Sequence, residues 1–266
     1  MRPSWRRRTS LLLAATLAVA VVLSISAPVA SADTAYNMEK QILALMNRDR
    51  VAAGLVAYRQ DHGLALVAGR RAGRMAARRI LSHSVAGGDL GSELRANRIQ
   101  FYTWAEAIGT TSYPWGSKAA ANLYSMWKHS APHRALMMST GYNYVGVGVV
   151  HASNGSTWAS IVFSDSADHT GASSRGVSVS KSGTTVSYAW TGADVRLQRR
   201  TSGLRSFDVQ YRVDGGRWLN LRNDTSTYRL DLANRERGHT YGFRVQAVDH
   251  RGNLGSWSSE LRVTLP

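Results

Sequence analysis

Hydrophobic residues recur at helical spacing in the first half of the chain. In the segment 36–51 the apolar side chains fall three or four positions apart, and Gly54 follows as a stop signal. A second helix is predicted over 64–81, where arginines fill the positions between the apolar ones, and a third over 117–128. The pattern therefore predicts amphipathic helices, each with one buried face.

After these helices the pattern changes to that of strands. The runs 144–151 and 157–164 are rich in β-branched and aromatic residues, and Asn154-Gly155 between them is a strong hairpin signal. Helices followed by an antiparallel hairpin indicate an α+β domain. The next stretch, 167–176, is dominated by small and polar residues without periodic apolar positions, so it is predicted to be a linker.

Beyond the linker only strand-like segments occur. They are 177–180, 185–190, 206–213, 218–221, 227–232, 241–248 and 260–265. Seven short alternating strands in 177–266 indicate an all-β sandwich. Tyr241, followed by alternating apolar positions, is typical of a tyrosine corner. Together with Trp190 and the run 249–256, it makes this region resemble bacterial fibronectin type III modules, which implies a spacer or a weak binding platform.

Composition and charge indicate the compartment in which the protein acts. The 266 residues include no cysteine, which excludes disulfides, Cys-ligated zinc, iron–sulfur clusters and thiol nucleophiles. Residues 1–32 carry four arginines, an apolar run at 11–25 and Ala30-Ser31-Ala32, the pattern of a cleavable secretory signal. The run is shorter than the roughly 20 residues that span a bilayer. We predict a secreted, extracellular protein without a transmembrane segment in the mature chain, whose formal charge falls from +16 to +12.

The positive charge also bears on the partners. It is divided almost evenly between the two halves, and no basic run with interleaved aromatics supports nucleic-acid binding. Arginines at 70, 71, 74 and 78 could form a basic stripe suited to anionic cell-wall polymers or a lipid surface. The same stripe is also what the solvated side of an amphipathic helix looks like, and that interpretation is favoured.

Residues with catalytic or ligand chemistry are scattered. The sequence has no nucleophile elbow, H-E-x-x-H motif or phosphate-binding glycine loop. Its candidate groups in the first domain are His62, His83, Glu106, His129, His133 and His151. His129 and His133 stand four apart, but Pro132 disfavours helical geometry at Ala131 and therefore argues against a shared helix face.

Several strings, taken in order, resemble the CAP superfamily (cysteine-rich secretory proteins, antigen 5 and pathogenesis-related 1), in particular its secreted bacterial, SCP-like branch. The strings are Leu43-Ala-Leu-Met-Asn47, Leu81-Ser-His83-Ser84, Ala105-Glu106-Ala-Ile108, Trp127-Lys-His-Ser130-Ala-Pro-His133-Arg134 and Tyr144-Val-Gly-Val-Gly148. The resemblance covers about 36–165. It implies an α–β–α sandwich with a cleft lined by His83, Glu106 and His133, in which His83 and His133 would ligate zinc or another divalent cation.

The chain departs from the family pattern at this cleft. Between Ala107 and Pro132 there is no acidic residue, so the family's second cleft glutamate is absent. Ala105 and Ala107 also replace the glycine and asparagine that flank the first glutamate in the family. A complete tetrad of two histidines and two glutamates therefore cannot form.

The sequence thus predicts an α+β, CAP-type domain over 33–166, a linker over 167–176 and a fibronectin type III-like domain over 177–266. The leading hypothesis is an extracellular binding protein whose cleft holds a divalent metal or a small ligand. One alternative is a metal-assisted hydrolase in which Glu106 is the general base to a metal-bound water. Another is adhesion of the second domain to anionic cell-envelope polymers, and all three are open at this stage.

Overall fold

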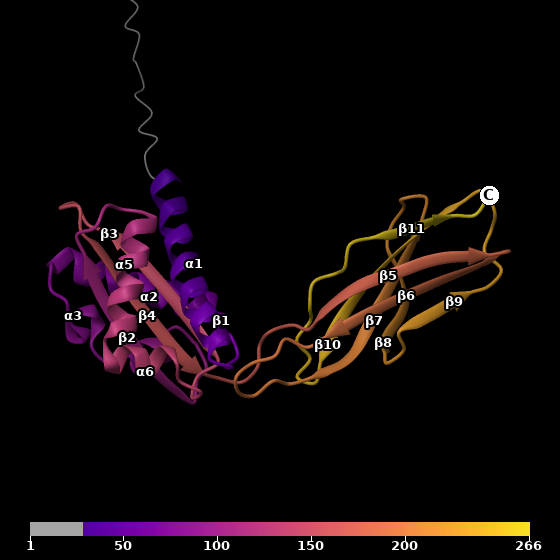
Figure 1. Ribbon diagram of the computed structural model, residues 1–266. Helices are drawn as coiled ribbons and strands as arrows, with labels where there is room; N and C mark the ends of the chain where they lie inside the picture. The colour runs from indigo at the N-terminus through magenta and orange to yellow at the C-terminus, as the bar shows by residue number, and fades with distance from the viewer. Residues whose placement is uncertain (1–28) are drawn as a thin grey trace, which may run out of the picture.

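The computed structural model describes residues 29–266, which form two units joined end to end (Figure 1). Most of the predicted signal sequence, 1–28, lies outside the described residues. Within 29–266 no helix combines the length and the hydropathy needed to cross a bilayer.

The first unit is built around one mixed sheet. Its strands follow the order β1 (Arg59–Gln60), β3 (Tyr144–His151), β4 (Thr157–Asp165) and β2 (Thr103–Thr111). Its helices are α1 (Val29–Ala52), α2 (His62–Arg78), α3 (His83–Gly87), α4 (Leu90–Ala96), α5 (Ser117–His129) and α6 (Ala131–Met137). The three helices predicted from periodicity and the β3–β4 hairpin are confirmed.

Helices cover both faces of this sheet (Figure 1). Apolar residues of α1 and α5 pack with Val145, Val147 and Val149 of β3 on one face. Residues of α2 and α4 pack with Tyr144 and Val162 on the other. The first unit is therefore the α–β–α sandwich that the resemblance implies.

Two glycines of β3 allow α2 to lie directly on the sheet. A Cβ at Gly146 or Gly148 would overlap backbone atoms of α2, at Ala65 and Gly69 respectively. The sequence V-G-V-G-V thus presents bare backbone to α2 and valines to the α1 side, because successive side chains of a strand point to opposite faces.

One local prediction was wrong. Pro132 was expected to keep Ala131 out of a helix, yet Ala131 is the first residue of α6. Proline is tolerated in the first helical turn because the amide that it lacks would have no intrahelical acceptor there. The short helices α3 and α4 and strand β2 were not predicted.

The second unit is all β, as predicted. One sheet has the order β5 (Ser173–Ser182), β6 (Thr185–Ala193) and β9 (Arg229–Leu232). The other has the order β11 (Leu261–Thr264), β10 (Thr240–Asp249), β7 (Leu204–Val213) and β8 (Leu219–Thr225). Their inward side chains share one apolar cluster, which is compatible with a β-sandwich.

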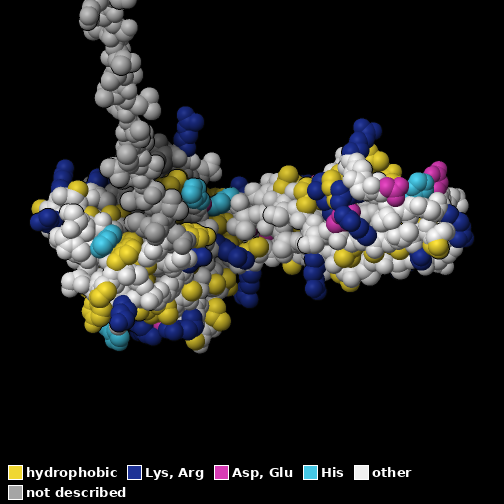
Figure 2. Space-filling model, turned by 90° about the horizontal axis from the view of Figure 1, so that it is seen from above, with side chains coloured by type: hydrophobic (Ala, Val, Ile, Leu, Met, Phe, Trp, Pro, Cys, Tyr) yellow, Lys and Arg dark blue, Asp and Glu magenta, His cyan; other side chains and the backbone are white. Residues whose placement is uncertain are grey.

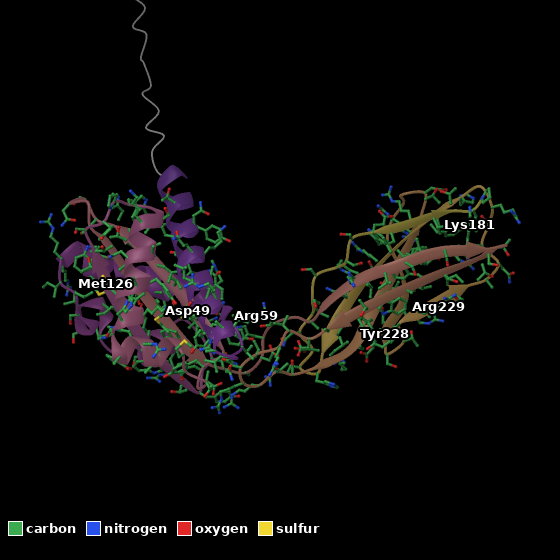
Figure 3. The ribbon with its side chains drawn as sticks, viewed as in Figure 1. Asp49, Arg59, Met126, Lys181, Tyr228 and Arg229 are labelled. Atoms are coloured by element: carbon green, nitrogen blue, oxygen red, sulfur yellow. The ribbon has the colours of Figure 1, made fainter. Side chains whose placement is uncertain are left out.

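Two contacts mark this second unit. The Tyr241 hydroxyl donates to the Glu236 carbonyl at 3.1 Å, as in a tyrosine corner. At the end of the unit that is far from the first, the Lys181 ammonium donates to the Thr264 carbonyl at 2.6 Å (Figure 3).

A loop of the second unit packs against the first. Leu197, between β6 and β7, is 3% exposed and joins the apolar cluster of α2 and α4. Next to it, the Gln198 side chain accepts from the Val56 amide at 2.9 Å, and Arg200 forms an ion pair with Asp165 at 2.9 Å. The predicted linker is shorter than expected, because 173–176 already belong to β5.

Candidate functional site

Glu106 lies in the middle of β2, in the layer between the sheet and α2. Its neighbours Ala105 and Ala107 pack in the cluster on the α1 side, so the alternation of the strand turns Glu106 toward α2. Its side chain is only 3% exposed. A carboxylate at that depth needs a partner charge and hydrogen-bond donors.

Arg71 of α2 supplies the charge. Its Nε lies 2.6 Å from Oε1 of Glu106 and its Nη2 lies 2.8 Å from Oε2, a bidentate pair between two buried side chains. Ser160 of β4 donates to Oε1 at 2.7 Å, and Nδ1 of His83 lies 2.7 Å from Oε2. Each carboxylate oxygen thus has two partners.

These partners decide the protonation state of Glu106. Burial by itself would raise the pKa of the carboxyl, but hydrogen bonds from Arg71, His83 and Ser160 outweigh it and lower the pKa below its usual value. Glu106 is therefore an ionised group whose lone pairs are occupied.

His83 begins α3, where Ser82 caps the helix through the Ser84 amide. Its side chain is 58% exposed. In the neutral form of the ring, a proton on Nδ1 donates to Glu106 and the Nε2 lone pair is left for a ligand.

His133 lies in the first turn of α6, where its Nδ1 is 2.9 Å from the Ser130 hydroxyl. Burial, and then the charge of His83, lowers the pKa of His133 below its usual value. The charge of His83 thus acts on His133 although the two residues are 50 positions apart in the sequence. The Trp127 indole, which donates to the Ile108 carbonyl at 2.9 Å, ties α5 to β2 beside this site.

His129 does not join them. It ends α5, whereas His133 belongs to α6, so the two do not share a helix face. Its Nδ1 lies 2.8 Å from the Ser125 carbonyl of its own helix. The separate helices and the contact of His129 with its own helix agree with the argument against a shared helix face.

The three cleft residues do not make a compact three-ligand centre. Among the described residues, the one group of three or more potential ligands with all its ligand atoms within 4.8 Å of one another is Asp168, Asp194 and Asp249. Glu106 directs its oxygens to Arg71, so His83 and His133 are the side chains of the predicted set with a free nitrogen.

The aspartate cluster lies at the junction between the units and was missed by the sequence reasoning. The Ser202 hydroxyl is 2.8, 3.3 and 2.6 Å from carboxylate oxygens of Asp168, Asp194 and Asp249. These oxygens could hold a hard divalent cation, and hydrogen bonds from Ser202 and nearby backbone amides already satisfy many of their lone pairs. Asp168 and Asp194 lie in separate loops and Asp249 ends β10, so no spacing in the sequence indicates the cluster.

Comparison with known proteins supports a CAP domain in the first unit. Residues 43–164, from α1 to β4, match the model of the Cysteine-rich secretory protein family, CAP. This match covers less than half of the chain. No curated protein matches the chain.

Solved structures show partial likenesses. One is an extracellular protein with an SCP domain from Bacillus anthracis, with 23% identity over 49% of this chain and 41% of that one, and a TM-score of 0.43. Another is a cysteine-rich secretory protein from Staphylococcus aureus, with 20% identity over 52% and 40% and a TM-score of 0.41. A third is an Fn3-like protein from Clostridium thermocellum, with 20% identity over 35% and 88% and a TM-score of 0.25. This chain thus spans about two-fifths of the length of the first two proteins.

Proposed function

We propose that the first unit is the CAP domain of a secreted binding protein, and that it holds a divalent metal ion or a small ligand between His83 and His133. The family match over 43–164 supports the domain, and the secretory pattern of 1–32 supports export. The second unit, with its seven strands and tyrosine corner, would be a fibronectin type III-like module after a linker that ends before Ser173.

The observation that carries the proposal is the way both imidazoles are held. Nδ1 of His83 faces the Glu106 carboxylate and Nδ1 of His133 faces the Ser130 hydroxyl, so each ring keeps its Nε2 for a ligand. Metal-binding histidines in proteins are commonly oriented by such a partner on the other ring nitrogen. The lowered pKa of His133 keeps that ring neutral, which is the form that binds a metal.

In this proposal Glu106 is a positioning residue. It orients His83 and is itself fixed by Arg71. A zinc ion bound by the two histidines would supply a Lewis-acidic centre with open positions for a ligand.

The same geometry argues against the hydrolase alternative. A general base needs a lone pair directed at its water and a pKa near the working pH. Glu106 has four hydrogen-bonding contacts and a lowered pKa. Binding without hydrolysis is therefore the function that the site supports best.

A zinc titration of the mature chain by calorimetry tests the proposal. We expect His83→Ala and His133→Ala each to abolish the binding event, and Glu106→Gln to weaken it by about 10- to 100-fold, as expected for loss of an orienting partner. His129→Ala is the matched control, because it removes an imidazole four positions from His133 that faces its own helix. Binding by both cleft variants with the affinity of the parent would exclude the site.

A turnover assay distinguishes the binding proposal from the hydrolase alternative. Turnover of peptidoglycan, protein or ester substrates that requires Glu106 would favour catalysis over binding. Ser130→Ala gives a second variant that leaves the Arg71–Glu106 pair intact and releases only Nδ1 of His133. It should weaken zinc binding even if Glu106→Gln proves too unstable to measure.

A further inference from the structure

A groove runs along the junction of the two units, away from the His83–His133 site. It consists of two adjoining cavities of about 620 and 420 Å³ that share lining residues from 98–100 and Ala167. The larger outer lobe follows the segment after α4, and the inner lobe extends to Arg251 and Asn253 of the second unit. Both units therefore contribute to one continuous surface.

Each lobe is lined by two arginines. Arg95 and Arg98 line the outer lobe, and Arg98 and Arg251 line the inner one. The side chains of Arg98 and Arg251 are exposed, and neither guanidinium has a hydrogen bond or an ion pair among residues 29–266. Arg95 faces Asp89 at 3.5 Å, but both side chains are more than half exposed, so the pair is weak.

The acidic residues of the groove are already engaged. Asp61 binds Nε2 of His169 at 2.8 Å and the Leu64 amide at 2.7 Å. Asp168 is buried and accepts from Tyr144 at 3.1 Å and from Ser202 at 2.8 Å. Asp61 and Asp168 keep their negative charge, so the inner lobe carries both signs, whereas the outer lobe is lined by Arg95 and Arg98 and by no acidic residue.

Aromatic rings form the wall of the outer lobe. The Arg95 guanidinium lies 5.8 Å from the ring centre of Phe101, and Tyr102 is 61% exposed. A polymer that lies along this lobe would therefore contact aromatic rings as well as cations. Figure 2 shows basic side chains at several places on this face, among them the region where the two units meet.

We propose that this groove binds a segment of a polyanionic chain that carries repeated phosphate or carboxylate groups. The guanidinium fork matches both groups, and the three arginines spread over the two lobes, Arg95, Arg98 and Arg251, can pair with successive charges along one polymer. The junction is fixed for this role by the buried Leu197 and by the hydrogen bond from Asn253 to the Asp168 carbonyl at 3.0 Å. This site goes beyond the proposed metal or ligand site and uses none of its residues.

Binding of polyphosphate and of polygalacturonate to the mature chain, measured by calorimetry at low salt, tests the inference. Neutral dextran is the uncharged reference. We expect at least one polyanion to bind, with an affinity that falls as salt is added. The polymer that binds more tightly shows whether phosphate or carboxylate is preferred.

The variants Arg98→Gln and Arg251→Gln locate the site. Their side chains make no hydrogen bond or ion pair to the described part of the chain, so the thermal midpoint should stay that of the parent. We expect each to weaken binding severalfold and the double variant to weaken it at least about tenfold, which corresponds to about 1.4 kcal/mol. Arg217→Gln is the charge-matched control, because Arg217 is an exposed arginine between β7 and β8 whose side chain has no partner within 29–266.

Two results would overturn the inference. One is that neither polyanion binds. The other is that Arg217→Gln weakens binding as much as Arg98→Gln, which would indicate attraction to the overall charge. His83→Ala should bind the polyanion like the parent, so failure of the metal site and failure of the groove are distinguishable.

Discussion

Replacing Arg71 with methionine removes the cation on which the centre of the first unit depends. Arg71 is 1% exposed and contacts both oxygens of Glu106, Oε2 of Glu93 at 3.0 Å, and the carbonyls of His83 and Gly88 at 3.3 Å. Methionine fills much of the same space without donors. Glu106, 3% exposed, is then left as a buried carboxylate without its counter-charge.

The expected cost follows from that unpaired charge. Removing one partner of a buried ion pair destabilises a protein by about 3–5 kcal/mol. For a unit of this size the thermal midpoint should fall by roughly 10–20 °C. Without Arg71, burial dominates and the pKa of Glu106 rises in the folded state. Stability of the variant should therefore fall further as the pH rises above the carboxyl pKa of the unfolded chain, so the loss is larger at neutral than at acidic pH.

Urea unfolding and thermal scans followed by circular dichroism measure this loss. Arg70→Met is the matched control, because Arg70 is the neighbouring residue of α2 but is 45% exposed, with Glu93 at 3.8 Å and Asn97 at 2.7 Å. It should cost less than about 1 kcal/mol. The double variant Arg71→Met/Glu106→Gln should recover part of the stability, since a neutral amide replaces the unpaired charge. An Arg71→Met variant as stable as Arg70→Met would refute the reasoning.

Three other outcomes are expected. Gly148→Ala should destabilise the first unit by at least about 1–3 kcal/mol, because the new Cβ meets the backbone of α2. Gly69→Ala places its Cβ in open space on a helix and should stabilise the unit by up to about 1 kcal/mol. Shifts of the denaturant midpoint in the same direction for both variants would contradict this. Burial raises the pKa of Glu39 to about 7, although the hydrogen bond from the Val149 amide lowers it. The unfolded chain therefore loses this proton at a lower pH than the folded chain, and stability falls as the pH rises toward 7. Glu39→Gln should flatten this slope in a pH series of urea midpoints, and an unchanged slope would contradict the prediction. Leu197→Ala should cost about 2–5 kcal/mol and speed protease cleavage at the junction, and an unchanged cleavage rate would show that the loop does not hold the two units together.

The elements that the sequence predicts are those with many periods of one pattern. The helix over 64–81 repeats its apolar positions for several turns, and the strands over 177–266 alternate for four or more residues each. α3 and α4, with five and seven residues, are too short to show a helical period. Most residues of β2 are small on both faces of the strand, so the alternation of apolar and polar positions is weak, although Ala107 and Ile108 are buried.

The candidate site, like the fold, was predicted only in part from the sequence. The resemblance singles out His83, Glu106 and His133, and the structure places His83 against Glu106, while the charge of His83 lowers the pKa of His133. The resemblance could not show that Glu106 would face an arginine. Arg71 lies 35 positions earlier, where its spacing suggests one more member of a solvated basic stripe. Of that stripe, Arg70 and Arg74 are partly exposed and Arg71 is buried.

The sequence by itself therefore determined the order of helices and strands, the division into an α+β part and an all-β part, and a stability without disulfides, because these depend on local periodicity and composition. The tertiary structure alone decided the charge state and the partners of Glu106, the meeting of three aspartates at the junction, and the groove between Arg98 and Arg251. The physical reason is that electrostatic interactions depend on distance and burial. Residues far apart in the sequence acquire both only when the chain is packed.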